Sequence, residues 1–105
     1  MLLEKGKKYK KSDFGIKGIV QQWSEITVEG KLFTFFSMVS KYNDIIEDDG
    51  FVYEGRGHYA LIPYGEKAIL HRHVFLKKET GSYYVYLGKG QYENRYDEKR
   101  NKIFW

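Results

Sequence analysis

The sequence contains no cysteine, which excludes disulfide bonds and thiolate metal sites. It has one proline, so no proline-rich linker divides the chain. No apolar run approaches the roughly 20 residues that cross a bilayer. The first eight residues reach charged side chains too soon to form the apolar core of a signal peptide. From these absences we expect one cytoplasmic domain spanning residues 1–105.

Aromatic and basic residues are what the sequence has in excess. Aromatic residues make up 18% of the 105 residues, and the formal net charge is +4. Lysine and arginine neutralise phosphates, and flat rings stack on bases, so this composition favours nucleic-acid binding. Aromatic residues also favour strands, and a surplus of four charges is ordinary in globular proteins. Composition alone leaves both interpretations open.

Charge is distributed unevenly along the chain. Lysines dominate the first 17 residues, acidic residues dominate residues 44–54, and basic residues outnumber acidic ones from Arg56 onward. An acidic segment between basic flanks either orients a domain on a polyanion or forms a solvated surface.

Short apolar and aromatic runs separated by turn residues predict the secondary structure. We expect strands at 32–39, 51–53, 83–87 and 103–105, with turns at 29–31, 48–50 and 79–82. Residues 68–76 fit a strand or a short helix, and residues 16–23 fit a helix. The predicted fold is mainly β with one or two short helices, as a curved sheet or β-barrel.

Residues 51–59 and 84–92 share one pattern: aromatic, Val, Tyr, any residue, Gly, basic, Gly, polar, Tyr. Each copy predicts a strand that ends at a glycine-flanked basic residue, Arg56 or Lys89, and then presents another ring. Backbone amides beside these two residues are candidates for phosphate contacts, because glycine allows close approach. The alternative is that each copy is only the end of a strand followed by a turn, with no role in phosphate binding.

The residues that catalysis needs are sparse. His71 and His73 share one face of an expected strand and form a possible metal pair, but zinc or iron usually takes three protein ligands. Asp13 with Glu29 and Lys31 matches a pattern of many nucleases. Here, however, Glu29 and Lys31 flank a glycine in an expected hairpin turn. We therefore expect no enzyme activity, no metal and no cofactor.

A series of aromatic and glycine motifs between residues 31 and 105 follows a fixed order. The motifs are Leu32-Phe33-Thr34, Tyr42-Asn43-Asp44, the segment 53–58, the segment 64–69, Val74-Phe75-Leu76, the segment 81–88 and a closing strand at 100–104. In this order the chain resembles the SRA (YDG) domains, particularly those of modification-dependent restriction endonucleases. The resemblance implies a PUA-like β-barrel that binds double-stranded DNA. It also implies rotation of 5-methylcytosine or a related base into an aromatic pocket.

Carried onto this chain, the resemblance assigns a base pocket and a DNA-backbone surface. The pocket rings are Tyr53, Tyr59, Tyr84 and Tyr86. The backbone or groove contacts are Arg56, Lys89, Arg72, Lys77, Lys78 and Arg95. Where many relatives have Gly-Asp soon after Gly-x-Gly, this chain has His58-Tyr59-Ala60, so Asp49, Glu54 or a backbone group would read the base instead.

The resemblance also implies that any nuclease or NTPase activity belongs to another domain or subunit. Two alternatives stay open. One is an RNA- or single-strand-binding barrel of the PUA or OB type, and the other is a small metal-dependent β-barrel enzyme using His71 and His73.

Overall fold

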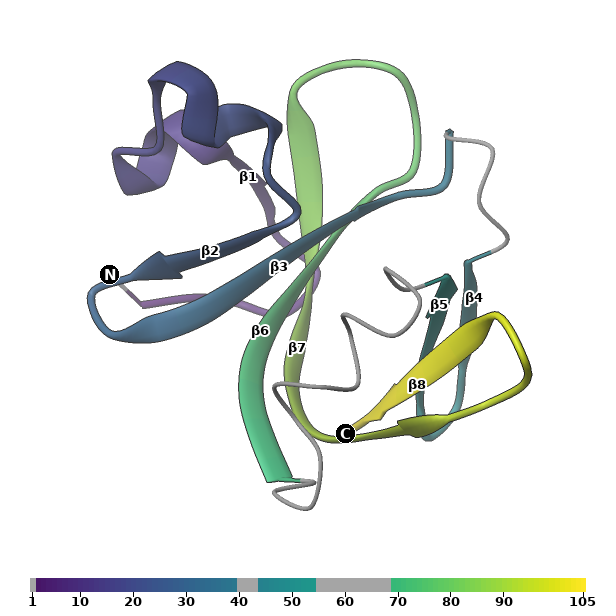
Figure 1. Ribbon diagram of the computed structural model, residues 1–105. Coiled ribbons are helices and arrows are strands. Elements are labelled where there is room, and N and C mark those ends of the chain that lie inside the picture. Colours follow the sequence, from purple (N-terminus) through teal and green to yellow (C-terminus); the bar gives the residue numbers. More distant parts are fainter. Residues whose placement is uncertain (1, 40–43, 55–68) are drawn as a thin grey trace.

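The computed structural model describes residues 2–39, 44–54 and 69–105, and there the chain forms one curled β-sheet (Figure 1). Its strands are β1 (Lys8–Lys10), β2 (Glu25–Val28), β3 (Lys31–Ser37), β4 (Ile45–Glu47), β5 (Gly50–Glu54), β6 (Ile69–Lys77), β7 (Tyr83–Arg95) and β8 (Arg100–Phe104). Two 3-10 helices, η1 (Lys11–Phe14) and η2 (Gly18–Gln22), lie between β1 and β2. No helix in these ranges is long and apolar enough to cross a membrane.

Strand β7 connects the two halves of the sheet. The strand order is β2-β3-β6-β7-β8-β5-β4, and β1 pairs with the first residues of β7. Strands β3 and β6 are parallel, whereas the other paired strands are antiparallel. Figure 1 shows β2 and β3 on one side of the curl, and β4, β5 and β8 on the other.

Two apolar cores lie on opposite faces of β6, because successive residues of a strand point to opposite sides. The first core consists of Tyr9, Ile16, Ile26, Phe33, Phe35, Phe75 and Tyr86. The second core consists of Phe51, Tyr53, Val74, Leu76 and Ile103. Burial on both faces explains why β6 reads as a continuous apolar run at Val74-Phe75-Leu76 rather than as an alternating one.

The predicted mainly β fold with a curved sheet is confirmed. Strands occur at all four predicted positions, and residues 69–77 form a strand rather than a helix. Residues 16–23, for which a helix was predicted, contain only the short 3-10 helix η2. No α-helix occurs in the described ranges.

The prediction that a strand ends at Lys89 is wrong. Strand β7 continues through Gly88-Lys89-Gly90 to Arg95. Gly88 has a φ of 114°, and the pairing with β6 shifts register between Val74 and Phe75. Gly88 therefore marks an irregularity within a long strand, and neither glycine terminates it. The other copy of the pattern, with Arg56 and Tyr59, lies outside the described residues.

Candidate nucleic-acid interface

A cavity of about 290 Å³ opens where the N-terminal segment meets the β6–β7 connection. We call it the lysine pocket. Its lining residues are Lys10, Lys11, Ser12, Gln21, Lys77, Gly81, Ser82 and Tyr84. Three lysines, two serines and one tyrosine thus line a single opening, and these residue types suit a phosphate-bearing ligand.

Local backbone structure fixes the N-terminal side of the lysine pocket. Strand β1 pairs with β7 in a register that sets Tyr9 opposite Tyr84 and Lys10 opposite Tyr83. The chain then turns into η1, where the Asp13 carboxylate accepts a hydrogen bond from the Lys10 N–H at 2.8 Å. Because β1 ends here, Lys10 and Lys11 lie beside the first residues of β7.

Lys11 anchors the second 3-10 helix to this pocket. Its Nζ donates hydrogen bonds to the backbone oxygens of Gln21 at 2.5 Å and Trp23 at 3.1 Å. Burial lowers the pKa of Lys11, and repulsion from the Lys77 ammonium lowers it further. An anion between the two lysines would relieve that repulsion.

The Tyr84 ring lies close to two of the ammonium groups of the pocket. Lys77 Nζ lies 4.9 Å from the ring centroid, and Lys11 Nζ lies 5.6 Å from it. Burial raises the pKa of the Tyr84 hydroxyl, so the phenol stays neutral at physiological pH. Tyr84 is the predicted pocket ring that the structure places beside concentrated positive charge.

The other described tyrosines of the predicted base pocket lie in the cores. Tyr53 is 4% exposed and packs in the second core, 4.6 Å from the Phe36 ring. Tyr86 is 6% exposed, and its hydroxyl lies 2.7 Å from Nδ1 of His73. The structure does not bring either ring to Tyr84 at a surface opening, and Tyr59 lies outside the described residues.

Arg72 is not a surface cation, contrary to the predicted DNA contact. Its side chain is fully buried, because both faces of β6 are covered, and it lies 3.0 Å from the Glu93 carboxylate and 3.9 Å from that of Glu25. Burial raises the pKa of Glu93 to about 8, and the Glu25 carboxylate adds to this rise. The adjacent Arg72 guanidinium opposes it.

The remaining predicted cations are dispersed. Lys77 lines the lysine pocket, Lys78 follows β6 and is exposed, and Lys89 and Arg95 are exposed along β7. Arg56 lies outside the described residues. Among the predicted basic residues that the structure describes, only Lys77 therefore joins Tyr84 at the pocket.

The two predicted acidic readers do not meet Tyr84. Asp49 accepts a hydrogen bond from Lys102 Nζ at 2.5 Å, and this bond lowers the pKa of the Asp49 carboxyl. Glu54 ends β5, and its backbone N–H donates to Asp44 Oδ1 at 3.3 Å. Both residues belong to the half of the sheet formed by β4, β5 and β8.

His73 packs against two rings of the first core, Phe33 and Tyr86. Its ring packs 5.2 Å from that of Phe33, and burial, together with Lys31 and Lys89, lowers its pKa. Within the described residues no three metal-ligating side chains gather. The side chain of His71 lies outside this description.

Sequence reasoning missed the pocket residues Lys10, Lys11, Ser12, Gln21 and Ser82 as site residues. Their one signal was the lysine-rich start, which identifies a basic segment and not the cavity that it lines. Comparison with known proteins adds no relative: no family model, curated protein or solved structure matches this chain.

Proposed function

We propose that this protein is a nucleic-acid recognition domain that binds duplex DNA through the lysine pocket. The observation that carries the proposal is that Lys11 and Lys77 place their ammonium groups beside the Tyr84 ring, at a cavity that Lys10 also lines. Lysine neutralises phosphate charge, and its contribution to binding does not depend on sequence. The same pocket offers hydroxyl donors from two serines.

The finer part of the proposal is that the DNA carries a modified base, 5-methylcytosine or a related one, which leaves the helix. It rests on the resemblance to SRA domains of the PUA-like fold. A rotated base must regain a few kcal/mol lost on unstacking, and stacking on one ring returns about 1–3 kcal/mol. Tyr84 is the ring we assign to this role, since Tyr53 and Tyr86 are buried.

Recognition is the whole of the proposed activity for this domain. Under this proposal it acts in the cytoplasm, and a nuclease or NTPase domain or subunit performs any reaction on the DNA. A metal-dependent enzyme using His71 and His73 is less well supported, because the His73 side chain packs against Phe33 and Tyr86.

The test is a fluorescence anisotropy titration of three matched duplexes that carry cytosine, 5-methylcytosine or 5-hydroxymethylcytosine at one position. We expect a modified duplex to bind more tightly than the unmodified one at every salt concentration. Equal affinity for all three would refute base reading while leaving DNA binding intact. Tighter binding of single strands or structured RNA in competition would instead favour the RNA- or single-strand-binding alternative.

Variants of Tyr84 separate ring stacking from charge. Tyr84→Leu should remove the preference for the modified duplex and leave the salt-dependent background, whereas Tyr84→Phe should keep both. Tyr96→Leu is the matched control, because Tyr96 is 45% exposed and lies outside the lysine pocket. Equal losses in Tyr84→Leu and Tyr96→Leu would remove the assigned role of Tyr84.

A further inference from the structure

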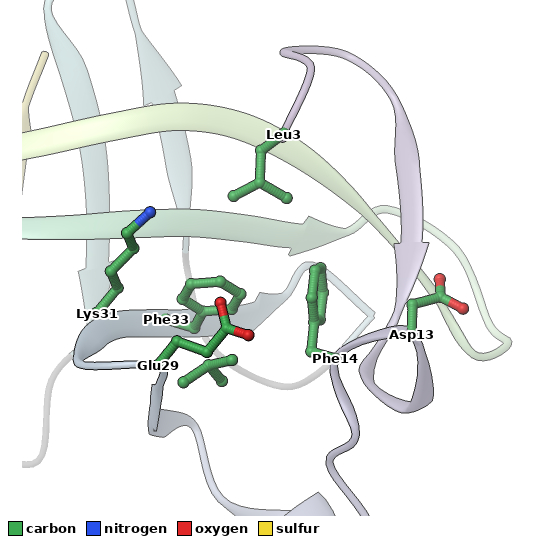
Figure 2. Close-up of a pocket in the computed structure, with 7 residues that line it drawn as sticks. Leu3, Asp13, Phe14, Glu29, Lys31 and Phe33 are labelled. Carbon is green, nitrogen blue, oxygen red and sulfur yellow. The ribbon is translucent and has the colours of Figure 1, made fainter. Parts of the chain in front are cut away.

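A second cavity, of about 130 Å³, lies apart from the lysine pocket, where η1 meets the β2–β3 hairpin (Figure 2). We call it the hairpin pocket. Leu3, Phe14, Val28 and Phe33 supply its apolar walls, and Asp13, Glu29 and Lys31 its charged groups. A cavity of about 150 Å³ accommodates benzene, so the hairpin pocket is large enough for a compact head group.

Two phenylalanine rings form adjacent walls of the hairpin pocket. The Phe14 and Phe33 rings are 5.0 Å apart between centroids and stand at 86° to each other. Figure 2 shows Leu3 above the two rings. The faces of aromatic rings carry partial negative charge and attract cations, particularly quaternary ammonium groups.

Glu29 supplies the charge that selects among ligands. In Figure 2 it extends toward the space beside Phe33, whereas Asp13 lies beyond Phe14. Asp13 is already engaged by the Lys10 N–H. In the described part of the chain the Glu29 carboxylate has no ion pair within 4.0 Å. Two carboxylates and one ammonium give the lining a charge of −1, although the whole chain carries +4.

The backbone at Glu29 is unfavourable for this residue type. Glu29 has a φ of 51° and Gly30 a φ of 77°, so both central residues of the two-residue hairpin have positive φ. Such turns strongly prefer Asn-Gly, Asp-Gly or Gly-Gly. Glutamate at the first of these positions is less favourable for the turn. The long side chain of Glu29 reaches the pocket from a position where the turn alone would favour a shorter residue.

We propose that the hairpin pocket binds a small quaternary ammonium group, with Phe14 and Phe33 contacting its methyl groups and Glu29 balancing its charge. The ligand class follows from the combination of a small cavity, two ring walls and a net negative lining. A neutral apolar ligand would gain nothing from Glu29, and an anion would be repelled by it. The site is independent of the proposed DNA binding.

The test is an NMR titration of the folded protein with choline chloride and, separately, with 3,3-dimethylbutan-1-ol, its uncharged isostere. Sodium chloride at equal concentration controls for ionic strength. We expect choline to shift the methyl signals of Leu3 and Val28 and the ring signals of Phe14 and Phe33 along one saturable curve. The alcohol should bind about tenfold more weakly, since it lacks the cation–π and ionic contributions.

Charge variants test whether the preference for choline depends on the charged residues of the hairpin pocket. Glu29→Gln should weaken choline binding about tenfold and leave binding of the alcohol unchanged. The control is Glu98→Gln, which removes the same charge from the exposed β7–β8 turn. It should change the affinity for neither ligand. Lys31→Gln should strengthen choline binding, because it removes the one ammonium in the lining. Glu29→Asn should abolish the charge selectivity and raise the midpoint of urea unfolding, because asparagine suits the turn.

Three outcomes would overturn the proposal. They are no saturable shift with choline, equal affinity for choline and the alcohol, and equal choline affinity in the Glu29→Gln variant and the unmodified protein. If Glu98→Gln weakened choline binding as much as Glu29→Gln does, net charge and not the hairpin pocket would explain the loss of affinity. None of these measurements involves DNA, so they succeed or fail separately from the proposed function.

Discussion

At the scale of single residues, the pKa of Lys11 reports on the electrostatics of the lysine pocket. Burial and the Lys77 ammonium both lower this pKa. The Lys77→Gln variant should therefore raise it, while burial keeps it below the usual lysine value. NMR titration of the Lys11 side-chain signals against pH measures the change.

Lys78→Gln is the control for this titration, because Lys78 is exposed and next to Lys77 in sequence. It removes the same charge and should leave the pKa of Lys11 nearly unchanged. An equal effect of both variants would show that overall charge, and not the pocket, sets the pKa of Lys11.

Glu93 gives a second residue-scale prediction, on stability. Burial raises its pKa to about 8 from the ordinary 4.5. Between these pH values the folded chain holds a proton that the unfolded chain has lost, so the free energy of unfolding falls as pH rises. The slope reaches up to about 1.4 kcal/mol per pH unit. The Glu93→Gln variant should lack this part of the pH dependence.

Urea unfolding of both proteins at pH 5, 6, 7 and 8 measures the effect. The difference between their unfolding free energies should change steadily across this range. A constant difference would mean that Arg72, 3.0 Å away, holds Glu93 ionised throughout.

At the scale of elements, β7 depends on close packing at one glycine. A Cβ at Gly90 would overlap Cγ2 of Ile103 in the second core. We expect Gly90→Ala to lower the free energy of unfolding by about 1–3 kcal/mol, the usual cost of overpacking. Lys89→Ala, at the exposed neighbouring position, should change it by less than about 0.5 kcal/mol. Equal unfolding midpoints in urea for the two variants would contradict this packing.

The strands that the sequence predicted, β3, β5, β7 and β8, each contain an apolar or aromatic run. The run in β6 fitted a strand or a short helix, and the structure extends β7 from the predicted 83–87 to 83–95. β1, β2 and β4 were not predicted, because each is short and includes charged residues, so that no apolar run or alternation distinguishes it. Lys8-Tyr9-Lys10 is a strand only because β7 lies beside it.

The candidate site shows the same limit. Sequence alternation correctly puts Tyr84 and Tyr86 on one face of β7, but it does not reveal where the N-terminal segment covers that face. Tyr9 packs edge-on against Tyr86, with centroids 6.5 Å apart, and so buries it, whereas Tyr84 remains at the lysine pocket. Arg72 was misjudged because a charged residue is expected at the surface, and only the fold shows a carboxylate facing it inside.

At the scale of the whole molecule, the question is whether the position of charge or its sum governs DNA binding. The pocket variant Lys10→Gln/Lys77→Gln and the control Lys17→Gln/Lys99→Gln each lower the net charge from +4 to +2. Lys11 is kept in both, because its ammonium also holds the backbone of Gln21 and Trp23. Lys17 and Lys99 are exposed and line no part of the lysine pocket.

If the lysine pocket contacts phosphates, the pocket variant should reduce the slope of log affinity against log salt concentration by about 1 to 2, since each phosphate contact contributes about 0.9. The control variant should weaken binding slightly at low salt and leave the slope nearly intact, because exposed charges away from the contact act only through the screened overall field. Anisotropy titrations of one unmodified duplex at four salt concentrations give both slopes. Equal reductions in the two variants would mean that the +4 charge attracts DNA without a defined contact, and the lysine pocket would then lose its assigned role.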